Sequence, residues 1–306
     1  MKLSIDFAFE GFRIVRQRPF VILLWGFVLL IGMVLGYGSF FAMAGSQLLP
    51  LIDAIKAGEN ANHEQIVSIV AAVFPALLVA VVIVSLFQIV LKCAIFRMSF
   101  GTKDTSFGGL RFGSDELRLI GASLLYFIVA LGVEIGLALG SLIVTTVLTM
   151  GFNAISPGLG GLGVFITIIL RYGLQIWFIC KMSLFSAQTF DEKRVNVFGS
   201  WTLTNGNFWP LLLGYIVAGV MLIVVYILCA VVFGTGFVVL SMSHPLPQFS
   251  SPADVFKAWQ SLLPFVILGG LALWIIMPLI MTITYGAPAA AYRQLTGNKR
   301  GAANVF

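Results

Sequence analysis

Six long apolar runs recur along the chain, each longer than the roughly 20 residues that an α-helix needs to cross the hydrocarbon core of a bilayer. The polar stretches between them are too short to form a soluble catalytic domain. The sequence therefore predicts an all-α, polytopic membrane protein whose six transmembrane helices form three hairpins. The predicted spans are Phe20–Met43, Ile66–Ile95, Leu119–Thr149, Gly163–Phe185, Trp209–Val239 and Leu262–Tyr285.

The composition supports a membrane protein and argues against a soluble one. Hydrophobic residues make up 59% of the chain and charged residues 10%, against roughly 45–50% and 25% in soluble domains. The net charge of +6 does not indicate a nucleic-acid partner, because the basic residues gather at one set of helix ends. We expect a single membrane domain over residues 1–306.

The distribution of Lys and Arg predicts the orientation of this domain. Fifteen basic residues lie in or beside the N-terminus, the second and fourth connections and the C-terminus, whereas the opposite connections hold two. Short loops with an excess of Lys and Arg stay in the cytoplasm. The pattern predicts a multi-pass protein of the bacterial inner (plasma) membrane with both termini cytoplasmic.

Each hairpin follows a segment that is predicted to be a cytoplasmic amphipathic interface helix. Phe9-Glu10-Gly11, Phe112-Gly113-Ser114 and Phe198-Gly199-Ser200 occupy equivalent places before the first, third and fifth spans. Such a pattern indicates a threefold repeat, although three matching residues also arise by chance. The predicted segments are an interface helix at 1–19, hairpin 1 at 20–98, an interface segment at 107–118, hairpin 2 at 119–187, an interface helix at 192–206, hairpin 3 at 208–295 and a cytoplasmic tail at 296–306.

The first interface helix carries three arginines, Arg13, Arg16 and Arg18, beside apolar residues. A helix of this kind lies in the headgroup plane, where its basic side chains meet anionic phosphates. We expect membrane lipids as partners, with anionic headgroups at these arginines. Anchoring and orientation of the chain is one interpretation, and a surface that recruits lipids or a protein partner is the other.

Two charges inside predicted spans are the candidate intramembrane site. Glu134 lies about halfway along the third span and Arg171 lies in the fourth, where Thr167 and Gln175 share its helix face. Their distances from the intervening turn place them at similar depths, and charges that face lipid are costly. The two side chains are therefore predicted to pair. The pair is either a structural lock of the central hairpin, or part of a proton or ion relay or a polar substrate cavity.

Gly132, Gly136 and Gly140 recur every four residues on the face of the third span opposite Glu134. Small residues at this spacing let a second helix approach closely. We expect this helix to be contacted from two sides.

No motif in the sequence indicates an enzyme. Residues 158–163 match the letters of the dinucleotide-binding fingerprint, but they lie in a predicted hairpin loop rather than between a strand and a helix. A P-loop, a zinc motif and a nucleophile elbow are absent from the sequence. We expect no cofactor, no metal site and no enzymatic activity, while a lipid enzyme assembled from scattered intramembrane polar residues stays an alternative.

Short motifs resemble a loose group of bacterial six-helix membrane proteins. An amphipathic N-terminal segment ends in Arg18-Pro19 before a Trp-bearing first span, and residues 200–204, 207–209 and 288–295 extend the similarity. The group includes uncharacterised integral membrane proteins and the membrane region of glycerophosphodiester phosphodiesterases. The resemblance implies a fold and no catalytic residues, because the phosphodiesterase domain has no counterpart in this sequence.

Three functions are compatible with these patterns. The leading hypothesis is a non-enzymatic membrane protein that organises or assists a lipid or envelope process or a membrane complex, with a membrane-protein partner or a second copy of the chain. The alternative is a transporter or channel component that uses Glu134 and Arg171. The third is the lipid enzyme.

Overall fold

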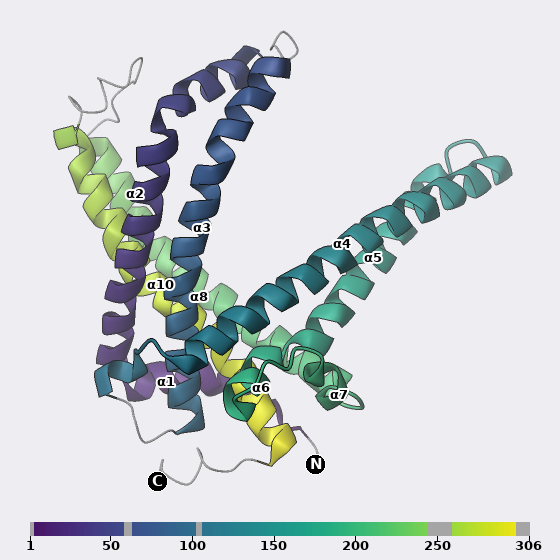
Figure 1. Ribbon diagram of the computed structural model, residues 1–306. Helices are drawn as coiled ribbons and strands as arrows, with labels where there is room; N and C mark the ends of the chain where they lie inside the picture. The colour runs from purple at the N-terminus through teal and green to yellow at the C-terminus, as the bar shows by residue number, and fades with distance from the viewer. Residues whose placement is uncertain (1–2, 58–62, 102–105, 244–258, 298–306) are drawn as a thin grey trace. The chain divides into compact units, whose positions relative to one another are not determined.

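The computed structural model describes residues 3–57, 63–101, 106–243 and 259–297 (Figure 1). In these ranges the regular structure is helical and no strand is present, as predicted for an all-α protein. Six helices are long and apolar enough to cross a membrane, so the chain is a multi-pass membrane protein. The candidate spans are Pro19–Leu48, Ile66–Phe100, Phe107–Ile155, Gly160–Glu192, Phe208–Ser243 and Ser261–Thr296.

Long helices alternate with short helical segments along the chain. The long helices are α2 (Pro19–Ala57), α3 (His63–Phe100), α4 (Ser114–Ile155), α5 (Gly160–Met182), α8 (Phe208–Ser243) and α10 (Trp259–Thr296). The short ones are η1 (Ile5–Phe9), α1 (Glu10–Gln17), η3 (Ser106–Gly109), α6 (Phe185–Glu192) and α7 (Gly199–Leu203). The predicted cytoplasmic tail at 296–306 lies outside the described residues after position 297.

The chain divides into two compact units. Unit 1 comprises Met1–Ala8, Phe112–Ile216 and Ala287–Phe306, and unit 2 comprises Phe9–Arg111 and Val217–Gly286. The sequence predicts a single membrane domain. Each unit combines segments that are far apart in the chain, so neither of them is a separate stretch of sequence.

Unit 2 is built on the antiparallel pair α2 and α3 (Figure 1). Trp25 and Leu29 of α2 pack with Leu91 and Ile95 of α3 in its buried core. The indole of Trp274 on α10 donates a hydrogen bond to the Leu23 carbonyl at 2.7 Å. This bond ties α10 to the beginning of α2.

The apolar face of α1 is covered by protein. Ile14 is buried in the same core as Trp25, and Gly11 lies against the backbone of α10 at Thr282 and Ile283. The predicted helix over residues 1–19 is also interrupted, because residues Ile5–Phe9 form the 3-10 segment η1. Part of the apolar surface that the sequence assigns to lipid is therefore a protein contact in this unit.

Unit 1 is built on the α4–α5 hairpin. The turn between the two helices is closed by Asn153, whose side-chain oxygen accepts a hydrogen bond from the Gly160 amide at 2.9 Å. At the other end of the hairpin Tyr126 stacks on Phe185, with ring centroids 4.5 Å apart. Phe178, Met182 and Val197 complete this buried cluster.

The other two predicted interface segments differ from the structure in their bounds. Residues 107–118 contain the end of η3 and the first residues of α4, which begins at Ser114 with the Glu116 side chain accepting a hydrogen bond from the Gly113 amide at 2.9 Å. This cap lets α4 run directly into the span, so no separate interface helix forms there. Residues 192–206 contain the five-residue helix α7.

The proposed sequence repeat coincides with helix starts. Phe9 and Phe198 are the N-cap residues of α1 and α7, and Gly113 is that of α4. The three glycines have different neighbours, however: Gly11 meets α10, Gly113 meets Glu116, and Gly199 meets Gln188 and Asn196. Common ancestry of the three segments stays a prediction.

Candidate functional site

Three of the four predicted intramembrane residues come together on the α4–α5 hairpin. Arg171 Nη2 lies 3.5 Å from Glu134 Oε2, and the Gln175 amide donates a hydrogen bond to Glu134 Oε1. We call these three residues the polar cluster. Thr167 is outside it, because its buried hydroxyl donates to the Gly163 carbonyl of its own helix at 2.9 Å.

The local sequence of α5 explains this arrangement. Arg171 and Gln175 are four residues apart, so both side chains project from the same face of the helix. That face meets α4, since Thr167 and Phe178 on the same side are buried. Glu134 Oε1 therefore accepts the hydrogen bond from Gln175, while Glu134 Oε2 forms the ion pair with Arg171.

The charged side chains of the polar cluster are only partly covered by protein. The side chain of Glu134 is 41% exposed and that of Arg171 is 38% exposed. None of the 18 residues in the most apolar window of the span that contains α4 is buried. Apolar residues surround the cluster, with Leu131 and Ile135 exposed by 49% and 52%. A charged pair thus lies on an apolar surface without complete burial.

Packing around α4 differs from the sequence expectation. A Cβ built on Gly132, Gly136 or Gly140 would meet no atom within 4 Å. The glycine face is therefore open in the described part of the chain, whereas the opposite face packs on α5. Within the described residues of unit 1, α4 contacts α6 as well as α5, but no neighbour reaches the three glycines.

The three predicted lipid-binding arginines have different environments in unit 2. Arg13 forms an ion pair with Glu10 at 2.7 Å and is partly buried. Arg16 and Arg18 are exposed, and Arg18 Nη1 lies 3.4 Å from Met98 Sδ. Of the three, Arg16 and Arg18 present their charges at the surface next to the start of α2.

The sequence reading missed a buried polar group at the same end of unit 2. Glu10 is 5% exposed and accepts hydrogen bonds from Arg13 and from the Ser99 hydroxyl at 3.0 Å. Arg97, which is 1% exposed, donates to the Gly109 carbonyl at 2.7 Å. The spacing of Glu10 and Arg13 was a usable signal for their pairing, but the positions of Ser99 and Gly109 depend on tertiary contacts.

Unit 1 carries two ion pairs that share one buried carboxylate near the start of α4. Asp115 accepts from Arg118 and from Lys193, in both cases at 3.0 Å. Asp115 is buried, while Lys193 is about half exposed. These contacts join the beginning of α4 to the end of α6 and hold the connection that follows α6.

The described residues add neither a metal site nor a polar cavity to the polar cluster. Within the described residues no group of three or more His, Cys, Asp or Glu side chains could hold a metal ion. A cavity of about 440 Å³ lies between α8 and α10 in unit 2. The residues that line this cavity are apolar and include Gly236, Leu240 and Pro264.

No protein-family model, curated protein or solved structure matches this chain. The resemblance to the membrane region of glycerophosphodiester phosphodiesterases therefore stays a prediction from sequence.

Proposed function

We propose that this protein is a non-enzymatic organiser of a membrane complex, and that the α4–α5 hairpin is its recognition element. The observation that carries this proposal is the half-exposed polar cluster of Glu134, Arg171 and Gln175 inside a candidate span. A charged side chain at the bilayer centre costs about 2.5–3.5 kcal/mol on insertion scales. Covering the cluster with another helix removes part of this cost.

The partner proposed for this surface is a second copy of the chain. Glu134 and Arg171 place opposite charges side by side, so the surface is complementary to itself under a twofold axis. Two copies related in this way would let the carboxylate of each chain approach the guanidinium of the other. The open face at Gly132, Gly136 and Gly140 offers a close approach for a further helix.

Membrane lipids with anionic headgroups are the second partner in this proposal. Arg16 and Arg18 are exposed beside the start of α2. Basic residues near an anionic leaflet contribute about 1 kcal/mol each to attraction. The proposal places this end of unit 2 at the cytoplasmic face of a bacterial inner membrane, with both termini in the cytoplasm.

A labelling experiment tests this orientation. Cysteine replaces Ser156 in the α4–α5 turn or Val195 after α6, both of which are exposed, in a background without Cys93, Cys180 and Cys229. We expect a membrane-impermeant maleimide to label position 156 in intact cells and position 195 only after permeabilisation. Labelling of position 195 in intact cells would contradict the proposed orientation.

Photo-cross-linking in native membranes tests the proposed function. A benzophenone amino acid replaces Ala138, which is exposed and lies one helical turn after Glu134 on the same side of α4. We expect a product of two 33.2 kDa chains, because the second copy covers this surface. Mass spectrometry of the product identifies the second chain.

The matched control places the same amino acid at Ile169. This residue is 55% exposed and lies two residues before Arg171, on the opposite side of α5 at nearly the same depth. Cross-linking from position 169 should be weak. A lack of any two-chain product from position 138 would contradict the proposal.

Transport through a polar pathway is the second candidate function. The same partial exposure of Glu134 and Arg171 favours it, because a relay needs charged groups that are not sealed. Proteoliposomes distinguish the two. Transport predicts a proton or ion flux that disappears in Glu134→Gln, whereas the organiser predicts the two-chain product without such a flux.

A further inference from the structure

The segment η3 (Ser106–Gly109), which lies between α3 and α4 in the chain, holds an aromatic residue in an unusual backbone conformation. Phe107 has φ 48° and ψ 36°, in the left-handed region, and its side chain is 84% exposed. The two residues that follow, Gly108 and Gly109, also have positive φ, at 67° and 75°. Glycine adopts this conformation freely, but a bulky residue does so only at an energetic cost.

Two buried side chains hold the backbone of η3 by hydrogen bonds. The Trp25 indole, which is fully buried, donates to the Gly108 carbonyl at 2.9 Å. Arg97, also buried, donates to the Gly109 carbonyl at 2.7 Å. A Cβ on Gly108 would lie 2.8 Å from Val21, so η3 is also pressed closely against α2. The strained position of Phe107 is therefore imposed by the surrounding structure.

The contacts of Gly108 show where Phe107 lies relative to the end of a candidate span. The side chains nearest to Gly108 are those of Val21, Leu24 and Trp25. These residues lie in the first two turns of the span that begins at Pro19, within about 10 Å of its end along the helix axis. The end of a membrane-spanning helix lies near the boundary between headgroups and acyl chains, where Trp and Tyr side chains are enriched.

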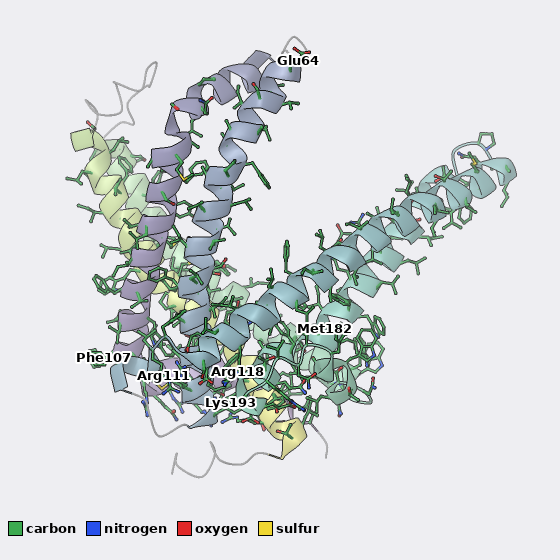
Figure 2. All side chains as sticks on the ribbon, viewed as in Figure 1. Glu64, Phe107, Arg111, Arg118, Met182 and Lys193 are labelled. Carbon is green, nitrogen blue, oxygen red and sulfur yellow. The ribbon has the colours of Figure 1, made fainter. Side chains whose placement is uncertain are left out.

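Exposed apolar residues and exposed arginines lie side by side around η3, as the boundary between acyl chains and headgroups favours. Phe20, at the start of α2, is 84% exposed like Phe107. Arg18 precedes the span and Arg111 follows η3, and both are exposed. In Figure 2 Phe107 projects outward beside the beginning of α2, with Arg111 at the same end of unit 2. Apolar side chains thus lie next to arginines that suit anionic headgroups.

We infer that Phe107 is a lipid anchor: its ring inserts among the upper acyl-chain carbons of the bilayer, while Arg111 stays with the headgroup phosphates. The energy lost by holding a phenylalanine at positive φ is offset by removing its ring from water. This anchor belongs to unit 2 and does not depend on the partner proposed for the α4–α5 hairpin. Its ligand is the lipid surface rather than a protein.

Depth-dependent quenching tests the anchor. Cysteine replaces Phe107 or Arg111 in a background without the three native cysteines, and each variant carries an environment-sensitive fluorophore. The full chain is reconstituted in vesicles of phosphatidylethanolamine and phosphatidylglycerol that contain a nitroxide near the top of one acyl chain. We expect about threefold stronger nitroxide quenching at position 107 than at position 111, and the reverse order with aqueous iodide. Equal iodide quenching at both positions would overturn the inference. Stronger iodide quenching at position 107 than at position 111 would do so too, because it would show that the Phe107 site is open to water in vesicles that hold only this protein.

A second variant gives a readout without a label. Asparagine adopts the left-handed backbone conformation more readily than phenylalanine. If the side chain at position 107 is exposed to water, Phe107→Asn should therefore relieve strain and raise the midpoint of unfolding. If the ring is in lipid, the loss of apolar burial is larger, and the midpoint in the same vesicles should fall instead. A raised midpoint in vesicles would contradict lipid insertion. Phe107→Trp, which keeps an interfacial aromatic ring, should leave the midpoint close to that of the wild type.

Discussion

Replacing Gly11 or Gly286 by alanine should strongly destabilise unit 2. A Cβ on Gly11 would lie 2.6 Å from the Thr282 carbonyl oxygen, and one on Gly286 would lie 2.8 Å from Gly11 Cα. The opposing atoms belong to the backbone, so no side chain can rotate away. Overpacking of this kind costs about 3 kcal/mol, which chemical unfolding of the purified protein in detergent measures.

The matched control is Gly38→Ala in α2 of the same unit. A Cβ at Gly38 would meet no atom within 4 Å, and alanine favours the helical state by about 1 kcal/mol. This variant should be unchanged or slightly more stable. Because Gly11 and Gly286 meet at one helix crossing, their double variant should lose less than the sum of the single losses. Losses no larger than that of the control would show that α1 does not cross α10 closely.

Neutralising one charge of the polar cluster should weaken both the hairpin and the proposed two-chain complex. Glu134→Gln leaves Arg171 without its carboxylate, and Arg171→Gln leaves Glu134 without its guanidinium, in a span where charges are costly. We expect each variant to lose about 2 kcal/mol of unfolding free energy in lipid nanodiscs. The double variant removes both charges, so it should lose less than the sum, with a coupling energy of about 1–3 kcal/mol.

Thr167 supplies the control for this cycle. Its hydroxyl lies on the same helix as Arg171 but bonds the Gly163 carbonyl. Thr167→Val removes that bond with little change in shape, so it should cost about 1 kcal/mol and show no coupling to Glu134→Gln. Additive losses for Glu134→Gln and Arg171→Gln would argue against a working pair.

The sequence predicts the spans and most of the polar cluster because both depend on local periodicity. Apolar length alone identifies six helices. Four-residue spacing places Arg171 and Gln175 on one face, and a short turn brings that face to the depth of Glu134. Thr167 has the same spacing, but its short side chain reaches the carbonyl of its own helix and not the neighbouring carboxylate.

The features that the sequence does not predict depend on contacts between distant segments. Gly11 meets residues of α10 that lie about 270 positions later, and no local pattern encodes that crossing. Phe107 adopts its left-handed conformation because Trp25 and Arg97 hold the two following carbonyls. The glycine series of α4 shows the converse, because its spacing indicates close packing while its face is open in unit 1.

The most direct test of the proposed function compares the Ala138 cross-link in the wild-type background with that in Glu134→Gln, in native membranes. If the polar cluster is the surface that a second copy covers, the yield of the two-chain product should fall at least about tenfold, which corresponds to a loss of about 1.4 kcal/mol in association. The amount of uncross-linked chain in the same membranes reports any general change in expression or insertion. An undiminished two-chain product in Glu134→Gln would contradict the claim that this cluster recognises the second chain.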